Sequence, residues 1–235
     1  NYGDYTYLDY QFTAIDGESN QFCGITTDRS IVCWGNNSTG TSPPDGEFKS
    51  LGVGESHSCA VNMDDLVECW GNDSYGQISY RPTEEVIAVD SGAYWSCAIT
   101  KSGDMVCWSN YSDHYTSVDA PDGEYVDLDL ALWSSCALDA DGTAWCFGDY
   151  NSVVHGLVEV GVGYYYGCGI QTDASATCWG WGGIFDQNEE SEESLPPEGV
   201  SFSQLSVGYY HTCGIDTDAG VHCWGSNDYG QSAPP

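Results

Sequence analysis

The sequence predicts an all-β fold, a six-bladed β-propeller of short antiparallel sheets with one disulfide-stapled hairpin in each blade. Three observations predict it: a cysteine-pair motif that recurs six times, a short apolar strand ahead of each pair, and an aromatic residue after it. The stretch HTCGIDTDAGVHCWG (211–225) shows the motif, with two cysteines ten positions apart around an Asp- and Gly-rich centre. A unit repeated along a chain is typical of repeat architectures such as propellers.

All twelve cysteines of the chain fall into such pairs. Successive pairs begin 32 to 45 residues apart, so one unit is long enough for one small sheet. The six pairs are Cys23 and Cys33, Cys59 and Cys69, Cys97 and Cys107, Cys136 and Cys146, Cys168 and Cys178, and Cys213 and Cys223.

The spacing within each pair predicts a β-hairpin. Residues that lie opposite each other across an antiparallel hairpin have a constant sum of positions, so opposed Cys213 and Cys223 set Ile215 opposite Val221. The Asp and Gly residues between them suit tight or left-handed backbone. The same rule gives an apolar pair in every other unit: Ile25 with Ile31, Val61 with Val67, Ile99 with Met105, Leu138 with Ala144, and Ile170 with Ala176.

Opposed cysteines on adjacent strands can reach disulfide distance, whereas a fourfold metal site would need two more ligands. We therefore expect a disulfide across each hairpin. Reduced cysteines packed as small apolar side chains, and a metal site, are the alternatives. An even cysteine count used entirely in pairs indicates an oxidising compartment, so we expect a secreted protein located outside the cell or at its surface.

A further apolar strand precedes each hairpin, so each unit offers at least three antiparallel strands. The aromatic residue after the second cysteine falls on the opposite face from that cysteine, because side chains alternate along a strand. A sheet that is apolar on both faces must be covered on both, and sheets stacked around an axis achieve this while shielding most strand edges. The preceding strands are expected at 12–17, 48–54, 86–92, 125–131, 157–163 and 202–208.

The chain divides into a single propeller domain, residues 11–235, and a tyrosine-rich extension, residues 1–10. The extension, NYGDYTYLDY, carries Tyr2, Tyr5, Tyr7 and Tyr10 and has a strand-like alternation. We expect it either to close the ring at the seam where the termini meet, or to add to the edge of a neighbouring molecule. Its four tyrosines are candidate assembly residues.

Two units, 48–77 and 202–231, resemble the repeat of the regulator of chromosome condensation family, and in repeat style they are most similar to beta-lactamase inhibitory protein II. The matching residues are strand-end glycines, Trp-Gly pairs and Gly-Gln pairs: Gly54, Gly208, Trp70-Gly71, Trp224-Gly225, Gly76-Gln77 and Gly230-Gln231. The resemblance implies a propeller and, through the inhibitor, a role in binding another protein. Best-known members of this family have seven blades, whereas this chain has six units.

Composition limits the partners. The chain has 36 acidic and 4 basic residues, a net charge of −32, which excludes nucleic acid and favours surface-bound divalent cations or saline surroundings. No apolar run is long enough to span a membrane. A first residue other than methionine is expected of a mature chain whose signal peptide has been removed. Glycosylation sequons begin at Asn36, Asn37, Asn72 and Asn110.

No motif for catalysis, cofactor binding or metal binding is present, so we expect no catalytic residue, no cofactor and no metal ligand. His57 and His211 occupy the same place in their units, but other residue types fill it elsewhere, which favours packing over a ring of ligands. The Asp-rich segments 139–142 and 216–220 resemble the start of calcium loops, yet they lie at hairpin tips where Asp and Gly serve the turn.

We therefore expect a secreted, non-enzymatic propeller that acts through protein contacts, most of all by self-assembly into a surface layer or filament. A soluble protein-binding or inhibitor module is the first alternative, and a carbohydrate-binding or hydrolytic propeller is the second. Tyrosine and tryptophan contribute strongly to protein contacts, although they also cap blade edges. Loop aromatics that suit such contacts are Tyr94, Trp95, Tyr111, Tyr115, Tyr164, Tyr165, Tyr166, Trp181, Tyr209 and Tyr210.

Overall fold

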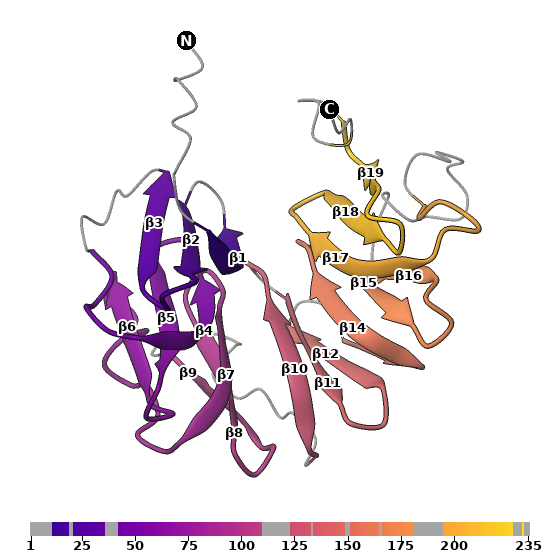
Figure 1. Cartoon of the computed structure of the whole chain (residues 1–235). Coiled ribbons are helices and arrows are strands. Elements are labelled where there is room, and N and C mark those ends of the chain that lie inside the picture. The colour runs from indigo at the N-terminus through magenta and orange to yellow at the C-terminus, as the bar shows by residue number, and fades with distance from the viewer. Residues whose placement is uncertain are drawn as a thin grey trace.

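The computed structural model describes residues 11–18, 21–35, 42–109, 123–132, 134–148, 151–164, 166–180, 195–227 and 232. Nineteen strands in six antiparallel sheets account for the secondary structure of these residues, which confirms the predicted all-β, six-bladed propeller (Figure 1). In this part of the chain no helix is long and apolar enough to cross a membrane. The tyrosine-rich extension 1–10 lies outside the described residues.

Each blade is built from consecutive strands, and blade 4 has a fourth. Blade 1 comprises β1 (Phe12–Glu18), β2 (Gln21–Thr26) and β3 (Ile31–Gly35); blade 2 comprises β4 (Phe48–Val53), β5 (His57–Asn62) and β6 (Val67–Gly71); blade 3 comprises β7 (Val86–Ser91), β8 (Ser96–Thr100) and β9 (Met105–Trp108). Blade 4 comprises β10 (Tyr125–Leu130), β11 (Ser134–Asp139), β12 (Thr143–Gly148) and β13 (Ser152–His155); blade 5 comprises β14 (Leu157–Val162), β15 (Tyr166–Gln171) and β16 (Ala176–Gly180); blade 6 comprises β17 (Phe202–Val207), β18 (His211–Asp216) and β19 (Val221–Gly225).

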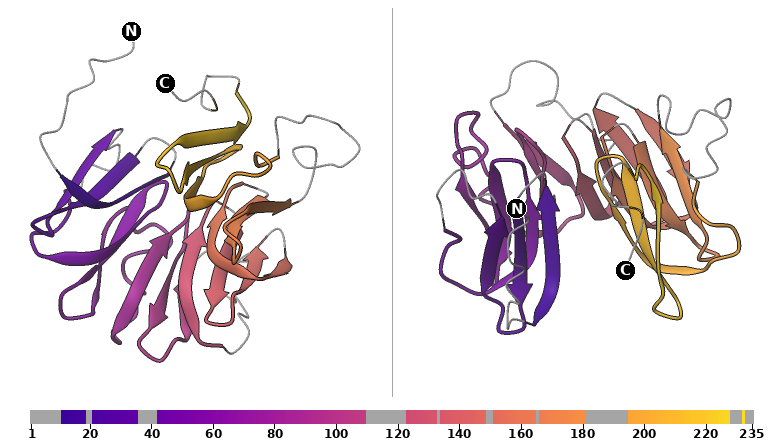
Figure 2. Two further views of the ribbon diagram at one scale, coloured as in Figure 1. Left: turned by 45° about the vertical axis from the view of Figure 1, so that its right-hand side comes forward. Right: turned by 90° about the horizontal axis from the view of Figure 1, so that it is seen from above.

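The blades follow one another around an axis (Figure 2, left). The first strand of each blade is the innermost, because these strands contact the first strands of the neighbouring blades. Blade 1 and blade 6 stand at the two ends of this array (Figure 1).

The predicted register is confirmed in all six hairpins, since each pair of cysteines and each predicted apolar pair lies directly opposite across the second and third strands. The first strand of every blade also carries a register shift near its start, for example between Phe12 and Ala14. This β-bulge was not predicted, because nothing in the residue pattern distinguishes a bulged strand from a regular one. Bulges bend a strand and increase its twist.

The core consists of separate layers between blades. Blade 1 contributes its disulfide face, with Cys23, Ile25 and Ile31, and blade 2 covers it with its aromatic face, including Phe48 and Trp70. The same arrangement recurs between blades 2 and 3, 3 and 4, 4 and 5, and 5 and 6. Every blade between the ends is thus covered on both faces, as the sequence predicts.

Candidate functional site

Every predicted cysteine pair forms a disulfide within its hairpin, with Cα–Cα separations of 4.0 or 4.1 Å. None of the twelve cysteines is free. The disulfide prediction is therefore confirmed, and the alternatives of reduced cysteines and a cysteine metal site do not hold. The six bonds occupy equivalent places in the six blades.

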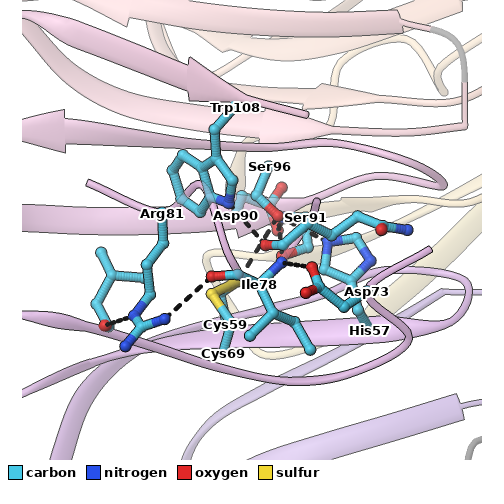
Figure 3. The surroundings of a disulfide bond; sticks show 12 residues. His57, Cys59, Cys69, Asp73, Ile78, Arg81, Asp90, Ser91, Ser96 and Trp108 are labelled. Carbon is cyan, nitrogen blue, oxygen red and sulfur yellow. Dashed lines mark hydrogen bonds between the residues drawn. A yellow bond between two sulfur atoms is a disulfide. The ribbon is translucent and has the colours of Figure 1, made fainter. Parts of the chain in front are cut away.

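Figure 3 shows how the Cys59–Cys69 disulfide sits at the junction of blades 2 and 3. The hydroxyl of Ser96 on β8 lies 2.7 Å from Nε2 of His57, 3.0 Å from the Ser91 hydroxyl and 3.6 Å from Sγ of Cys59. Ser96 of blade 3 thus links two residues of β5 in blade 2 to its own inner strand β7. The polar groups beside the disulfide therefore join blade 2 to blade 3.

The Gly-Gln pair that contributes to the family resemblance also acts at this junction. Gln77 is fully buried, and its backbone carbonyl accepts a 2.7 Å hydrogen bond from the indole N–H of Trp108 in the next blade. The units before blades 5 and 6 lack this pair. The buried indole N–H groups of Trp179 and Trp224 correspondingly have no partner among the described residues.

In blades 1, 2 and 5 the residue that begins the second strand bonds to the next blade. Gln21 donates to the Ser58 hydroxyl at 3.0 Å, His57 pairs with Ser96, and the Tyr166 hydroxyl donates to the His211 carbonyl at 2.7 Å. Burial lowers the pKa of His57 to about 4, so its imidazole is neutral near pH 7. Burial also lowers the pKa of His211. Packing, as predicted, accounts for His57.

Carboxylates gather along the inner strands. Asp16 of blade 1, Asp90 of blade 3 and Asp129 of blade 4 hold equivalent register positions, each opposite the first cysteine of its blade. Each accepts a hydrogen bond from a backbone N–H of a neighbouring blade's inner strand: Val53 N to Asp16 at 2.6 Å, Leu130 N to Asp90 at 2.6 Å, and Val162 N to Asp129 at 2.5 Å.

Burial and mutual repulsion favour the protonated form of these three groups. Burial, with the charges of Asp16 and Asp129, raises the pKa of Asp90 well above its ordinary value. Burial raises the pKa of Asp129 to about 8, and it also raises the pKa of Asp16. The carboxyl groups therefore brace one blade against the next.

Sequence reasoning missed this group. The signal was present, because Asp16, Asp90 and Asp129 occupy the same place in their units. Clustered carboxylates are also the feature expected of a hydrolytic propeller. Here, however, each group is engaged by a backbone N–H of the neighbouring blade, and no set of three metal-ligating side chains is arranged around an ion site in the described ranges.

Tyrosines gather at the loops between first and second strands. Tyr164 of blade 5 stacks on Tyr209 of blade 6 at 4.4 Å between ring centroids, and Tyr210 meets Tyr209 edge-on at 4.4 Å. Tyr94 of blade 3 packs edge-on against Tyr75 at 5.2 Å. Tyr209 and Tyr210 are exposed. We call Tyr164, Tyr209 and Tyr210 the tyrosine cluster.

Two of the predicted contact aromatics are core residues instead. Trp95 immediately precedes β8 and Tyr166 begins β15, and both are buried because they fill the space between blades. Tyr111, Tyr115, Tyr165 and Trp181 lie outside the described residues.

The outer faces of the two end blades expose apolar side chains at positions whose counterparts inside the described array are buried or half-buried. On the disulfide face of blade 6, Ile215 is 39% exposed and Val221 is 52% exposed. Their counterparts between blades 1 and 2, Ile25 and Ile31, are 2% and 8% exposed. On the aromatic face of blade 1, Ile15 is 59% exposed and Phe22 is 41% exposed, while Phe12 and Trp34 are half-buried.

The remaining predicted sites fall at turns. Asp139 accepts backbone hydrogen bonds from Asp141 and Thr143, and Asp216 accepts them from Asp218 and Gly220 while pairing with His222, so both segments are structural turns. Asn72 is half-buried and its side-chain oxygen accepts the Ser74 N–H. Sequon residues Asn36, Asn37 and Asn110 lie outside the described residues.

The fold and the disulfide within each hairpin define a disulfide-rich β-propeller made of one tandem repeat. Residues 202–231, which include all of blade 6, match the family model of the regulator of chromosome condensation (RCC1) repeat. The predicted resemblance to the repeat of this family is thereby confirmed on these residues, which include one of the six blades. No sequence among the curated proteins matches the chain.

Solved structures agree on the fold. The ectodomain of the receptor kinase CR4 from Physcomitrella patens is similar with a TM-score of 0.75 and 24% identity, over 92% of this chain and 62% of that chain. The CRINKLY WD40 ectodomain of the receptor kinase ACR4 from Arabidopsis thaliana is similar with a TM-score of 0.72 and 23% identity, over 92% of this chain and 81% of that chain. Prp20p from Saccharomyces cerevisiae is similar with a TM-score of 0.50 and 15% identity, over 92% of this chain and 58% of that chain. The chain thus spans less than two thirds of the CR4 ectodomain.

Proposed function

We propose that this protein is an extracellular, non-enzymatic propeller that acts through protein contacts, and that its copies associate with one another into a layer or filament. The exposed apolar faces of the two end blades are the observation that carries the proposal. At all five junctions between blades, apolar surface of this kind is covered by the neighbouring blade. A contiguous exposed apolar surface commonly marks an interaction site.

An extracellular place is supported by the disulfide in every blade, since such bonds persist in oxidising compartments. The two plant structures of similar fold are receptor ectodomains. The sequon asparagines, if glycosylated, would belong to the same setting. A non-catalytic role is supported by the carboxyl groups of the inner strands, which are engaged in bracing the blades.

The test is the mass of the protein in solution, measured by mass photometry or sedimentation at several protein and salt concentrations. We expect association to strengthen with salt, because the net charge of −32 repels copies and salt screens that repulsion. Electron microscopy of the full chain and of a chain starting at Gln11 then shows whether Tyr2, Tyr5, Tyr7 and Tyr10 take part. A protein that stays monomeric under all these conditions would contradict the proposal.

A second candidate function is the binding of a different extracellular protein through the tyrosine cluster. Tyr209 and Tyr210 are exposed; Tyr209 stacks on Tyr164 and Tyr210 meets Tyr164 edge-on, which suits a rigid aromatic contact. Such a binder would remain monomeric until its partner is added.

A further inference from the structure

We propose that the aromatic face of blade 1 in one copy seats on the disulfide face of blade 6 in a second copy, forming a sixth junction of the kind that the chain already forms five times. This inference rests on the proposed self-association and names the surfaces that carry it. The occupant of each open face is therefore a second copy of this chain.

The five internal junctions show what each face is built to cover. In each of them a disulfide face lies beneath the aromatic face of the following blade. The array begins with an aromatic face and ends with a disulfide face. One copy thus carries both halves of one further junction, and two copies placed head to tail bring these halves together.

The apolar residues of the two end faces correspond to those of the internal junctions. Ile215 and Val221 of blade 6 hold the register positions of Ile25 and Ile31, which are buried under blade 2. Phe12 packs on Trp34 at 5.4 Å, as Phe202 packs on Trp224 at 5.5 Å where blade 6 covers blade 5. These are uncharged surfaces on a strongly acidic protein.

Blade 1 differs from the other blades at one opposed pair of residues, where a large side chain on the second strand compensates for a glycine on the first. Gly17 and Phe22 lie opposite each other, and a Cβ atom on Gly17 would come within 2.2 Å of the Phe22 ring. Phe22 therefore lies over Gly17 and stacks on Trp34 at 6.1 Å. In the other blades the first strand has the larger or equal residue and the second strand a small one: Val53 with Ser58, Ser91 with Ser96, Leu130 with Ser135, Val162 with Gly167, and Val207 with Thr212.

The polar contacts of the junction also have their counterparts. Ser50 accepts the Val89 N–H at 3.2 Å, and Glu159 accepts the Leu205 N–H at 2.6 Å, each across a junction. Gln204 of blade 6 occupies the register position of Ser50 and Glu159, and its amide oxygen is an acceptor. Ile15 of blade 1 occupies the position of Val89 and Leu205.

A head-to-tail contact of this kind joins two different faces, so it gives a closed ring of copies if the rotation between copies closes and a filament if it does not. Blocking one face removes only one half of the junction. This asymmetry allows a test in which two blocked variants complement each other.

The experiment uses the full chain and three variants at high salt. Ile215→Glu/Val221→Glu blocks the blade 6 face, Ile15→Glu blocks the blade 1 face, and Val158→Glu is the matched control. Val158 is 59% exposed, as is Ile15, but lies on β14 away from both end faces. Unchanged circular dichroism and melting verify that each variant folds, which the exposure of the replaced residues favours.

We expect the wild type and Val158→Glu to associate alike, and each blocked variant to show dimerisation weakened on the order of tenfold or more, because the junction would bury unpaired charge. An equal mixture of the two blocked variants should form species of two chains and no larger, since it has one intact pair of faces. Mass photometry measures both results.

Association of the blocked variants like that of the wild type, or a mixture that fails to pair, would overturn the junction while leaving self-association intact. A wild type that stays monomeric at every salt concentration would overturn both proposals. Residues 1–10 of the same chain or a different protein would then be the occupant of the faces.

Discussion

At the scale of single residues, the hairpin tips show how strictly the backbone is repeated and how loosely the side chain is chosen. The sixth residue after the first cysteine has a positive φ of 66° to 88° in every blade. Two blades place glycine there, whereas the others use Arg29, Asp65, Ala174 and Ala219. A left-handed conformation costs a residue with a Cβ on the order of 1 kcal/mol. The turn is therefore imposed by the hairpin on either side of it.

This strain gives a prediction for Ala174→Gly and Ala219→Gly. Each should raise the free energy of unfolding by about 0.5 to 1 kcal/mol, because glycine removes the Cβ clash and loses some of that gain to the entropy of the unfolded chain. Thermal or denaturant unfolding measures the change. Ala140→Gly, at an exposed turn position without a positive φ, is the control and should not stabilise. Equal effects at all three positions would show that the left-handed backbone is not strained.

Residue pairs across the hairpins could be predicted from the sequence because register obeys simple arithmetic once one pair is known. Ile215 and Val221 follow from Cys213 and Cys223 in this way. The role of Asp90 could not, because its hydrogen-bond partner Leu130 lies in another blade, 40 positions along the chain. Likewise, the sequence shows only that Trp95 and Tyr166 lie beside loops. They become core residues because the next blade packs over them.

At the scale of the element, the unit is a three-stranded sheet whose second and third strands are joined covalently. Each disulfide closes a loop with a sequence separation of 10. In the chain-entropy model a loop of that size contributes about 3 kcal/mol whichever blade holds it. The environment of the bonds differs, however, because Cys97 is fully buried at a junction, whereas Cys213 and Cys223 lie on the half-exposed end face.

This contrast predicts unequal costs for two double substitutions. Cys213→Ala/Cys223→Ala should lower the free energy of unfolding by about 3 kcal/mol, the loop term alone. Cys97→Ala/Cys107→Ala should cost at least about 1 kcal/mol more, because it also removes sulfur atoms packed beneath blade 4. Denaturant unfolding of the two variants under non-reducing conditions measures the difference. Identical losses would mean that packing around the buried sulfurs contributes nothing.

The three strands and the disulfide of each blade could be predicted from the sequence, because each is determined by residues within one repeat unit. The bulge in every first strand and the extra strand β13 were not. The segment SVVH of β13 is too short for its alternation to separate a strand from a loop.

At the scale of the whole molecule, the inner strands hold the blades together by hydrogen bonds to carboxyl groups whose pKa values are raised by burial. Asp16, Asp90 and Asp129 take part directly, and burial also raises the pKa of the nearby Asp127 and Glu159. A group whose pKa is higher in the folded than in the unfolded chain adds stability at low pH and loses it as the pH rises through the folded value. For Asp129 that loss runs from an ordinary pKa of 3.8 up to about 8.

The stability of the Asp129→Asn variant should therefore fall less with rising pH than that of the wild type. Its amide oxygen can still accept the Val162 N–H, and it cannot ionise. We expect its melting temperature to exceed that of the wild type by several degrees near pH 8, with the gap closing toward pH 5, since about 1 kcal/mol corresponds to about 2–4 °C in a domain of this size. His57 acts oppositely, because its pKa of about 4 makes its stabilising effect fade as the pH falls below 6.5.

Calorimetry at a series of pH values measures this gap. Asp141→Asn, which removes a charge from an exposed hairpin tip, controls for general repulsion on a chain of net charge −32. A gap that is independent of pH, or that is equal for both variants, would show that Asp129 is already ionised in the folded protein at neutral pH.

Because all five junctions pair the same two faces, the architecture has no fixed length. Duplication of a unit of this repeat inserts a blade whose two faces already match its neighbours, and deletion of a unit leaves behind two faces that match each other. A gene built from such units can grow or shrink without the invention of a new interface. The units before blades 5 and 6, which lack the Gly-Gln pair, show how far a unit can differ in sequence while its two faces still fit.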